Sequence, residues 1–220
     1  MTITLIFLAF LMGAVIWWLF RQTIDAQPWV AHAAATDVHA SVLERPTAKM
    51  ALGVFLAVAT SLFALFISAY AMRMHFGDWT PVPEPRLLWW NTALLVVTSI
   101  VMQMTVQAAR RGDRLALRNR LLTSGVLTCA FLVGQLLAWQ QLDAAGYYLA
   151  SNPANGFFYL LTAVHALHVL GGLVAWGRTA MRLGRDDEAA RLQLGVQLCA
   201  TYWHFLLIVW IVLFGLLLLT

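Results

Sequence analysis

The sequence has 220 residues, of which 61% are hydrophobic and only 11% are charged. So little charge cannot keep a domain of this size in aqueous solution, and we expect an integral membrane protein. The net charge of +4 comes almost entirely from arginine, because Lys49 is the only lysine. Nucleic acid would require a basic face on a soluble surface, so we expect no nucleic-acid partner.

Six segments approach or exceed the roughly 20 apolar residues that cross a bilayer as a helix. The first ends at Trp17, Trp18 and Arg21, and it lacks the basic start and the cleavage site of a signal peptide, so we expect a retained helix. The fold class we predict is an all-α membrane protein, a bundle of six transmembrane helices. Its predicted spans are 2–20, 50–72, 87–109, 121–141, 157–177 and 195–219.

Basic residues are distributed unevenly over the connections between these segments. The connections after the first, third and fifth segments hold twelve of the fourteen lysines and arginines. The other two, Arg73 and Arg86, lie in the connection after the second segment. Because basic residues accumulate in cytoplasmic loops, we expect both termini on the outer, periplasmic side.

The ten carboxylates all lie in the predicted connections. Pumps usually keep ionisable groups at membrane depth, and here only histidines are available there. We therefore expect neither a self-contained pump nor a catalytic centre in this chain. Cys129 and Cys199 match no metal-binding spacing, and we interpret both as small buried side chains.

Three histidines in the last two segments are the candidates for chemistry. His165 and His168 share one face of a helix, and His204 follows in the last segment. Imidazoles on facing helices can hold haem or a metal ion. We favour the competing interpretation, in which each imidazole hydrogen-bonds to a neighbouring helix, because no carboxylate or cysteine accompanies the histidines. The candidate partners are Tyr202, Asn91, Gln103 and Gln135.

Two stretches carry a family resemblance, FFYLLTAVHALHVLGG from Phe157 and YWHFLLIVW from Tyr202. They resemble the FF-x-x-T-G-x-H-G-x-H-V-x-x-G and YWHF-x-x-x-VW patterns of subunit III of haem-copper oxidases. PRLLWWNTALLVVTSIVM from Pro85 resembles a third segment of that family. The matches follow the family order and cover most of residues 50–220, so the chain is similar to the cytochrome c oxidase subunit III family.

The resemblance implies a division into an N-terminal helix (1–20), a cytoplasmic loop (21–49) and a five-helix core (50–220). Family members have five or seven helices, so six would mean that the first of seven is missing. Many members also carry a membrane-embedded glutamate at a position that falls near Val58. No acid lies between Lys49 and Arg73 here, so no role of that carboxylate carries over.

The resemblance also implies an accessory, non-redox subunit of a respiratory oxidase that reduces O2 to water and translocates protons. It implies a bacterial inner membrane, direct contact with subunit I, and association with subunit II and other subunits. Haem and copper would then reside in the partner subunits and not in this chain. The motif residues would be structural: His165, His168, Tyr202, Trp203 and His204.

Two alternatives remain open at this point. One is a subunit III-like partner of a nitric oxide reductase or a quinol oxidase. The other comes from a different class, a di-haem b-type membrane cytochrome that uses the three histidines.

The resemblance further implies bound structural phospholipid and support for proton uptake. We expect the lipid phosphates on basic residues at the cytoplasmic interface, beside two tryptophans that contact the acyl chains. These residues are Trp17, Trp18, Arg21, Lys49, Arg178 and Arg182. A weaker hypothesis places proton buffering on His32 and His39 in the predicted cytoplasmic loop.

Overall fold

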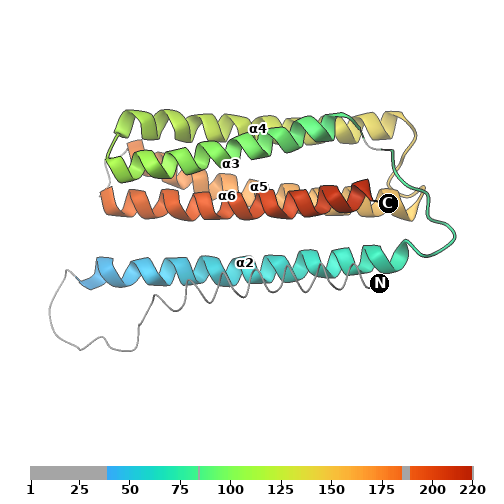
Figure 1. The fold of residues 1–220 in the computed structure, drawn as a ribbon, viewed down its shortest axis with the longest axis horizontal. Helices are drawn as coiled ribbons and strands as arrows, with labels where there is room; N and C mark the ends of the chain where they lie inside the picture. Colours follow the sequence, from blue (N-terminus) through green and yellow to red (C-terminus); the bar gives the residue numbers. More distant parts are fainter. Residues whose placement is uncertain (1–38, 84, 185–188, 220) are drawn as a thin grey trace. The chain divides into compact units, whose positions relative to one another are not determined.

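The computed structural model describes residues 39–83, 85–184 and 189–219, and these residues form five helices without a strand (Figure 1). The helices are α2 (His39–Arg73), α3 (Leu87–Arg111), α4 (Arg114–Ala144), α5 (Pro153–Gly184) and α6 (Ala189–Leu218). All five are long and apolar enough to cross a membrane. The expected all-α membrane protein is therefore confirmed, whereas the predicted first helix (2–20) lies outside the described residues.

The helices are longer than the predicted spans, because the prediction counted apolar residues alone. The predicted loop 110–120 shrinks to Gly112 and Asp113, since Arg, Leu and Ala favour the helix as strongly as many apolar residues do. Gly112 adopts the left-handed conformation, with φ of 71°, that ends α3. The Asp113 carboxylate then accepts a hydrogen bond from Ala116 N at 3.0 Å and caps α4.

The same extension occurs at the other ends. Most of the predicted loop 178–194 is helical, because α5 continues to Gly184 and α6 starts at Ala189. The helix α2 begins at His39 rather than at residue 50, so Lys49 stands on a helix. Glu44 and Asp143, which we expected in loops, also lie within helices, near their ends.

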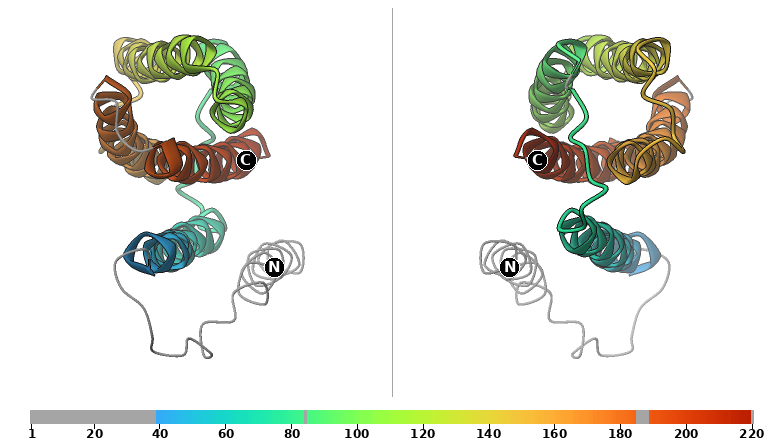
Figure 2. Two further views of the ribbon diagram at one scale, coloured as in Figure 1. Left: turned by 90° about the vertical axis from the view of Figure 1, so that its left-hand side faces the viewer. Right: turned by 90° about the vertical axis from the view of Figure 1, so that its right-hand side faces the viewer.

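The chain divides into two compact units, one through Ala71 and one from Met72. In the second unit α3 packs against α4 and α6, and α5 packs against the same two helices. The four helices therefore surround a common axis, as the end-on views show (Figure 2). Neighbours in the sequence are antiparallel neighbours in space, the up-down arrangement that short connections favour.

Small residues let these helices approach closely. A Cβ atom added to Gly134 would lie 2.1 Å from Asn91 Oδ1, and one added to Gly125 would lie 2.3 Å from the Trp176 ring. Through the space at Gly134, Asn91 of α3 reaches α4 and donates to Gln135 Oε1 at 3.4 Å. Membrane helices generally use small residues in this way, because packing rather than water exclusion holds them together.

Charge separates the two ends of the four-helix unit. Seven arginines lie where α3 meets α4 and where α5 and α6 face their connection: Arg110, Arg111, Arg114, Arg118, Arg178, Arg182 and Arg191. Arg120 lies close to this group, and its guanidinium donates to the carbonyl of Met104 on α3 at 2.8 Å. We call this end the arginine-rich end; it is the left-hand end of α3 to α6 in Figure 1.

Hydrogen bonds join the connections at the opposite end. Asn152 accepts from Ala154 N at the start of α5 and donates to Thr80 in the connection before α3. Arg73 donates two hydrogen bonds to Asp78 and thereby lowers the pKa of that carboxyl from its ordinary value. The ion pair therefore persists at pH values below the ordinary Asp pKa.

Candidate functional site

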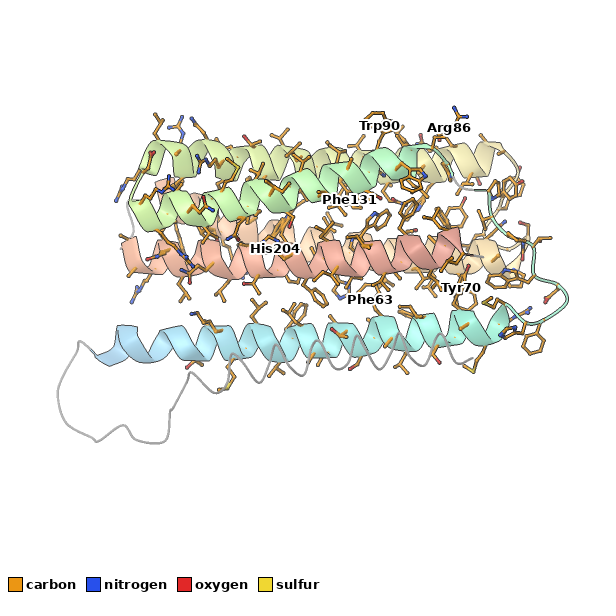
Figure 3. All side chains as sticks on the ribbon, viewed as in Figure 1. Phe63, Tyr70, Arg86, Trp90, Phe131 and His204 are labelled. Carbon is orange, nitrogen blue, oxygen red and sulfur yellow. The ribbon has the colours of Figure 1, made fainter. Side chains whose placement is uncertain are left out.

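The histidine motif comprises His165 and His168 on α5 with Tyr202, Trp203 and His204 on α6. His165 has no solvent exposure and lies between two aromatic rings from neighbouring helices. Its ring centroid is 5.9 Å from that of Phe131 on α4 and 5.1 Å from that of Trp210 on α6. Figure 3 shows Phe131 inside the bundle of α3 to α6. His165 is thus part of the aromatic core of the four-helix unit.

His168 and Tyr202 join α5 to α6. The Tyr202 hydroxyl donates to the backbone carbonyl of His168 at 2.9 Å, and His168 Nδ1 bonds to the carbonyl of Val164 at 2.8 Å. The Tyr202 ring fits because residue 172 has no side chain: a Cβ there would lie 2.8 Å from Tyr202 Cε1. The second glycine of the pair, Gly172, therefore makes room for the tyrosine of the second motif.

Trp203 belongs to a set of tryptophans whose indole N–H groups bond to other helices. Trp203 donates to Thr128 Oγ1 at 3.1 Å, and Trp210 donates to Thr92 Oγ1 at 2.9 Å. Trp139 donates to Thr162 Oγ1, and Trp176 donates to the carbonyl of Leu121. Sequence reasoning missed these bonds, although the threonines in apolar segments were a signal for them. A bonded indole both fills volume and fixes helix rotation.

His204 faces a different helix from His165. Its Nδ1 bonds to the Ser99 hydroxyl and its Nε2 to Gln103 Oε1 at 3.3 Å, both on α3. Figure 3 shows His204 on the side of α6 next to α3. Of the expected partners, Gln103 bonds His204, Tyr202 bonds the His168 backbone, and Asn91 bonds Gln135 instead. Within the described ranges no three His, Cys, Asp or Glu side chains form a group that could hold a metal ion.

The predicted lipid-binding residues are only partly described. Trp17, Trp18 and Arg21 lie outside the described residues. Lys49 is an exposed residue of α2, in the unit that ends at Ala71. Arg178 and Arg182 are exposed residues near the end of α5, one turn apart, at the arginine-rich end.

The two histidines proposed for proton buffering are also only partly described. His32 lies outside the described residues, and His39 is the first residue of α2. The structure therefore describes no contact for this pair.

Comparison with known proteins assigns the sequence to one family model, that of cytochrome c oxidase subunit III, which matches residues 3–219. A probable cytochrome c oxidase subunit 3 of Mycobacterium tuberculosis is 35% identical over 156 residues, which are 70% of this chain and 76% of that relative. A cytochrome c oxidase subunit 3 of Corynebacterium diphtheriae is 30% identical over 159 residues, with the same coverage. One from Synechocystis is 31% identical over 166 residues, covering 73% of this chain and 70% of the relative.

The Gly-Gly pair provides a matched test of how the histidine motif packs. Gly171→Ala meets nothing within 4 Å and should stabilise the helix by up to about 1 kcal/mol. Gly172→Ala should destabilise the protein by about 1–3 kcal/mol, because the methyl group displaces the Tyr202 ring. Thermal unfolding in detergent, followed by tryptophan fluorescence, checks both values. Equal effects of the two substitutions would contradict the described contact between α5 and α6.

Proposed function

This chain belongs to the cytochrome c oxidase subunit III family and is an accessory subunit of a haem-copper oxidase; from that premise we propose how it serves the complex. Its contribution is mechanical, because Tyr202, Trp203 and His204 bond α6 to α5, α4 and α3. The observation that carries this proposal is the burial of His165 among Phe131 and Trp210, with His204 bonded to a different helix. Histidines placed in this way stabilise a packing arrangement and do not converge on one cofactor.

The proposed complex supplies the redox chemistry from other subunits. Haem and copper reside in subunit I, or in subunits I and II, and this chain contacts subunit I directly. The complex reduces O2 to water and translocates protons across the bacterial plasma membrane. The bacterial relatives and the five membrane-capable helices support this location.

We extend the proposal to the parts that the structure does not describe. The chain has six transmembrane helices, with an N-terminal helix at 1–20, a cytoplasmic segment at 21–49 and a core at 50–220. Both termini face outward, so the arginine-rich end lies in the cytoplasm. The family match from residue 3 supports the first helix, and the positive-inside rule supports the orientation.

The complex as purified tests the assignment. We expect a haem-copper catalytic subunit to co-purify with this chain, and mass spectrometry of the subunits distinguishes an oxygen-reducing oxidase from a nitric oxide reductase. The chain separated from its partners should show no Soret absorption band. A Soret band that stays with this chain would overturn the accessory role and restore the di-haem cytochrome.

Phospholipid is the proposed ligand of the chain itself. Arg178 and Arg182 are exposed, lie one turn apart and stand at the end of α5 where phosphate groups would lie. An arginine near an anionic membrane surface contributes about 1 kcal/mol of attraction. Arg21, Lys49, Trp17 and Trp18 complete the site in the proposal, the first two on phosphate and the tryptophans on the acyl chains.

Paired substitutions test the lipid site. Arg178→Gln with Arg182→Gln should weaken retention of anionic phospholipid roughly thirtyfold, the equivalent of about 2 kcal/mol. Arg114→Gln with Arg118→Gln removes the same charge at the same end from α4 and should leave retention unchanged. Native mass spectrometry of the purified complex measures the retained lipid. If both double variants lost lipid equally, general surface charge would explain lipid retention and the specific site would be excluded.

Proton buffering by His32 and His39 is a separate proposal. Imidazoles at a cytoplasmic surface exchange protons near neutral pH and can supply an uptake pathway in subunit I. Replacing both with glutamine should slow proton uptake by the complex between about pH 6 and 8, the range in which imidazoles titrate. Unchanged uptake kinetics in a stopped-flow measurement would remove the proposal.

A further inference from the structure

Three side chains form a hydrogen-bonded series across the contact between α3 and α6. Gln103 Oε1 can only accept, so His204 Nε2 donates to it at 3.3 Å. The other ring nitrogen, Nδ1, is then an acceptor and receives the hydrogen of the Ser99 hydroxyl. The series runs from buried Ser99 through half-buried His204 to exposed Gln103.

The outer end of this series is an amide with two remaining N–H donors. Among the residues that the structure describes, none accepts a hydrogen bond from the Gln103 amide nitrogen. The orientation of the amide follows from His204, which uses the Gln103 oxygen. Both donors therefore have no acceptor among the described residues of the α3–α6 contact.

This amide lies at membrane depth. At 1.5 Å per residue, Gln103 is about 12 Å from Arg111 and about 24 Å from Leu87, the two ends of α3. The hydrocarbon core is about 30 Å thick, so with Arg111 at the headgroups the amide stands well inside it. Hydrocarbon offers no acceptor, and an unsatisfied amide there is costly.

The surface around Gln103 is apolar and exposed. Ile100 is 55% exposed and precedes Gln103 by one turn, and Ile208 and Ile211 are 57% and 51% exposed on the His204 face of α6. We call this surface, formed by Ile100, Gln103, His204, Ile208 and Ile211, the α3–α6 seam. The seam combines exposed isoleucines with one polar group, the Gln103 amide. Contacts between membrane helices commonly have this composition.

We propose that the α3–α6 seam docks a transmembrane helix of the catalytic subunit, and that this helix presents an acceptor oxygen to the Gln103 amide. The partner group is a carboxylate, a hydroxyl or a free backbone carbonyl. A second copy of this chain that met the seam through the same surface fits less well, because its Gln103 oxygen already accepts from His204 and has one lone pair left for two N–H donors. The inference rests on the proposed function for the existence of the partner, and it adds the surface and the chemistry of the contact.

Site-specific crosslinking in the intact complex tests the location. A photoreactive benzoylphenylalanine at Ile100 or Ile208 should crosslink this chain to a larger membrane subunit. The same group at Val126 or Val133, exposed on α4, is the control for background labelling. Crosslinks from the seam to residues 50–72 of the same chain, to a second copy, to lipid alone, or no more often than from α4, would overturn the proposal.

Two substitutions test the chemistry. Gln103→Leu keeps the volume but removes both donors, and the chain should then dissociate from the complex about threefold faster, as expected for one hydrogen bond between membrane helices. Ser99→Ala breaks the same series at its buried end and should leave dissociation unchanged. Equal acceleration by both variants would mean that only the fold of this chain was disturbed, and no acceleration by Gln103→Leu would exclude the contact. If the unmodified chain did not co-purify with a haem-copper subunit, the proposed function itself would fail.

Discussion

A membrane-embedded chain has to satisfy its polar groups without water, and this constraint determines how α3 to α6 are joined. Many of their indole and hydroxyl groups, and the imidazoles of His168 and His204, bond across helix contacts or to the preceding turn of their own helix. Trp203 bonds to Thr128, Trp210 bonds to Thr92, and Tyr202 bonds to a backbone carbonyl of α5. Because hydrocarbon stabilises an apolar surface as well as a protein interior does, such bonds and close packing carry the specificity of the bundle.

The histidine motif illustrates how one residue type serves two different purposes. His165 fills the space between Phe131 and Trp210, where its ring behaves as one more aromatic group. His204 bonds through both ring nitrogens to α3 and thereby connects buried Ser99 to exposed Gln103. A pattern that first suggests cofactor ligands therefore belongs to the contacts between the helices.

The sequence was sufficient for the helical class, for the approximate position of each described helix and for the motifs that mark the family. It also suggested Tyr202 and Gln103 as hydrogen-bonding groups, because polar residues are few in the apolar segments. It could not pair them, since the partner of a side chain depends on how each helix is rotated about its axis. Helix ends were misplaced for another reason: apolar length marks the bilayer, whereas α3 and α4 continue into arginine-rich turns that favour helix equally well.

The connection between α3 and α4 has a consequence for the whole hairpin. Asn91 is 21 residues before Gly112 (112 − 91), and Gln135 is 22 residues after Asp113 (135 − 113), so both stand at one level and can bond. The length of this two-residue connection therefore determines which residues of α3 and α4 lie opposite each other along the hairpin. Surface loops usually accept extra residues at little cost. Here an added residue that joined α4 would turn that helix by about 100° relative to α3, because a helix has about 3.6 residues per turn. The short connection at Gly112 and Asp113 thus determines how α3 and α4 are aligned along their contact.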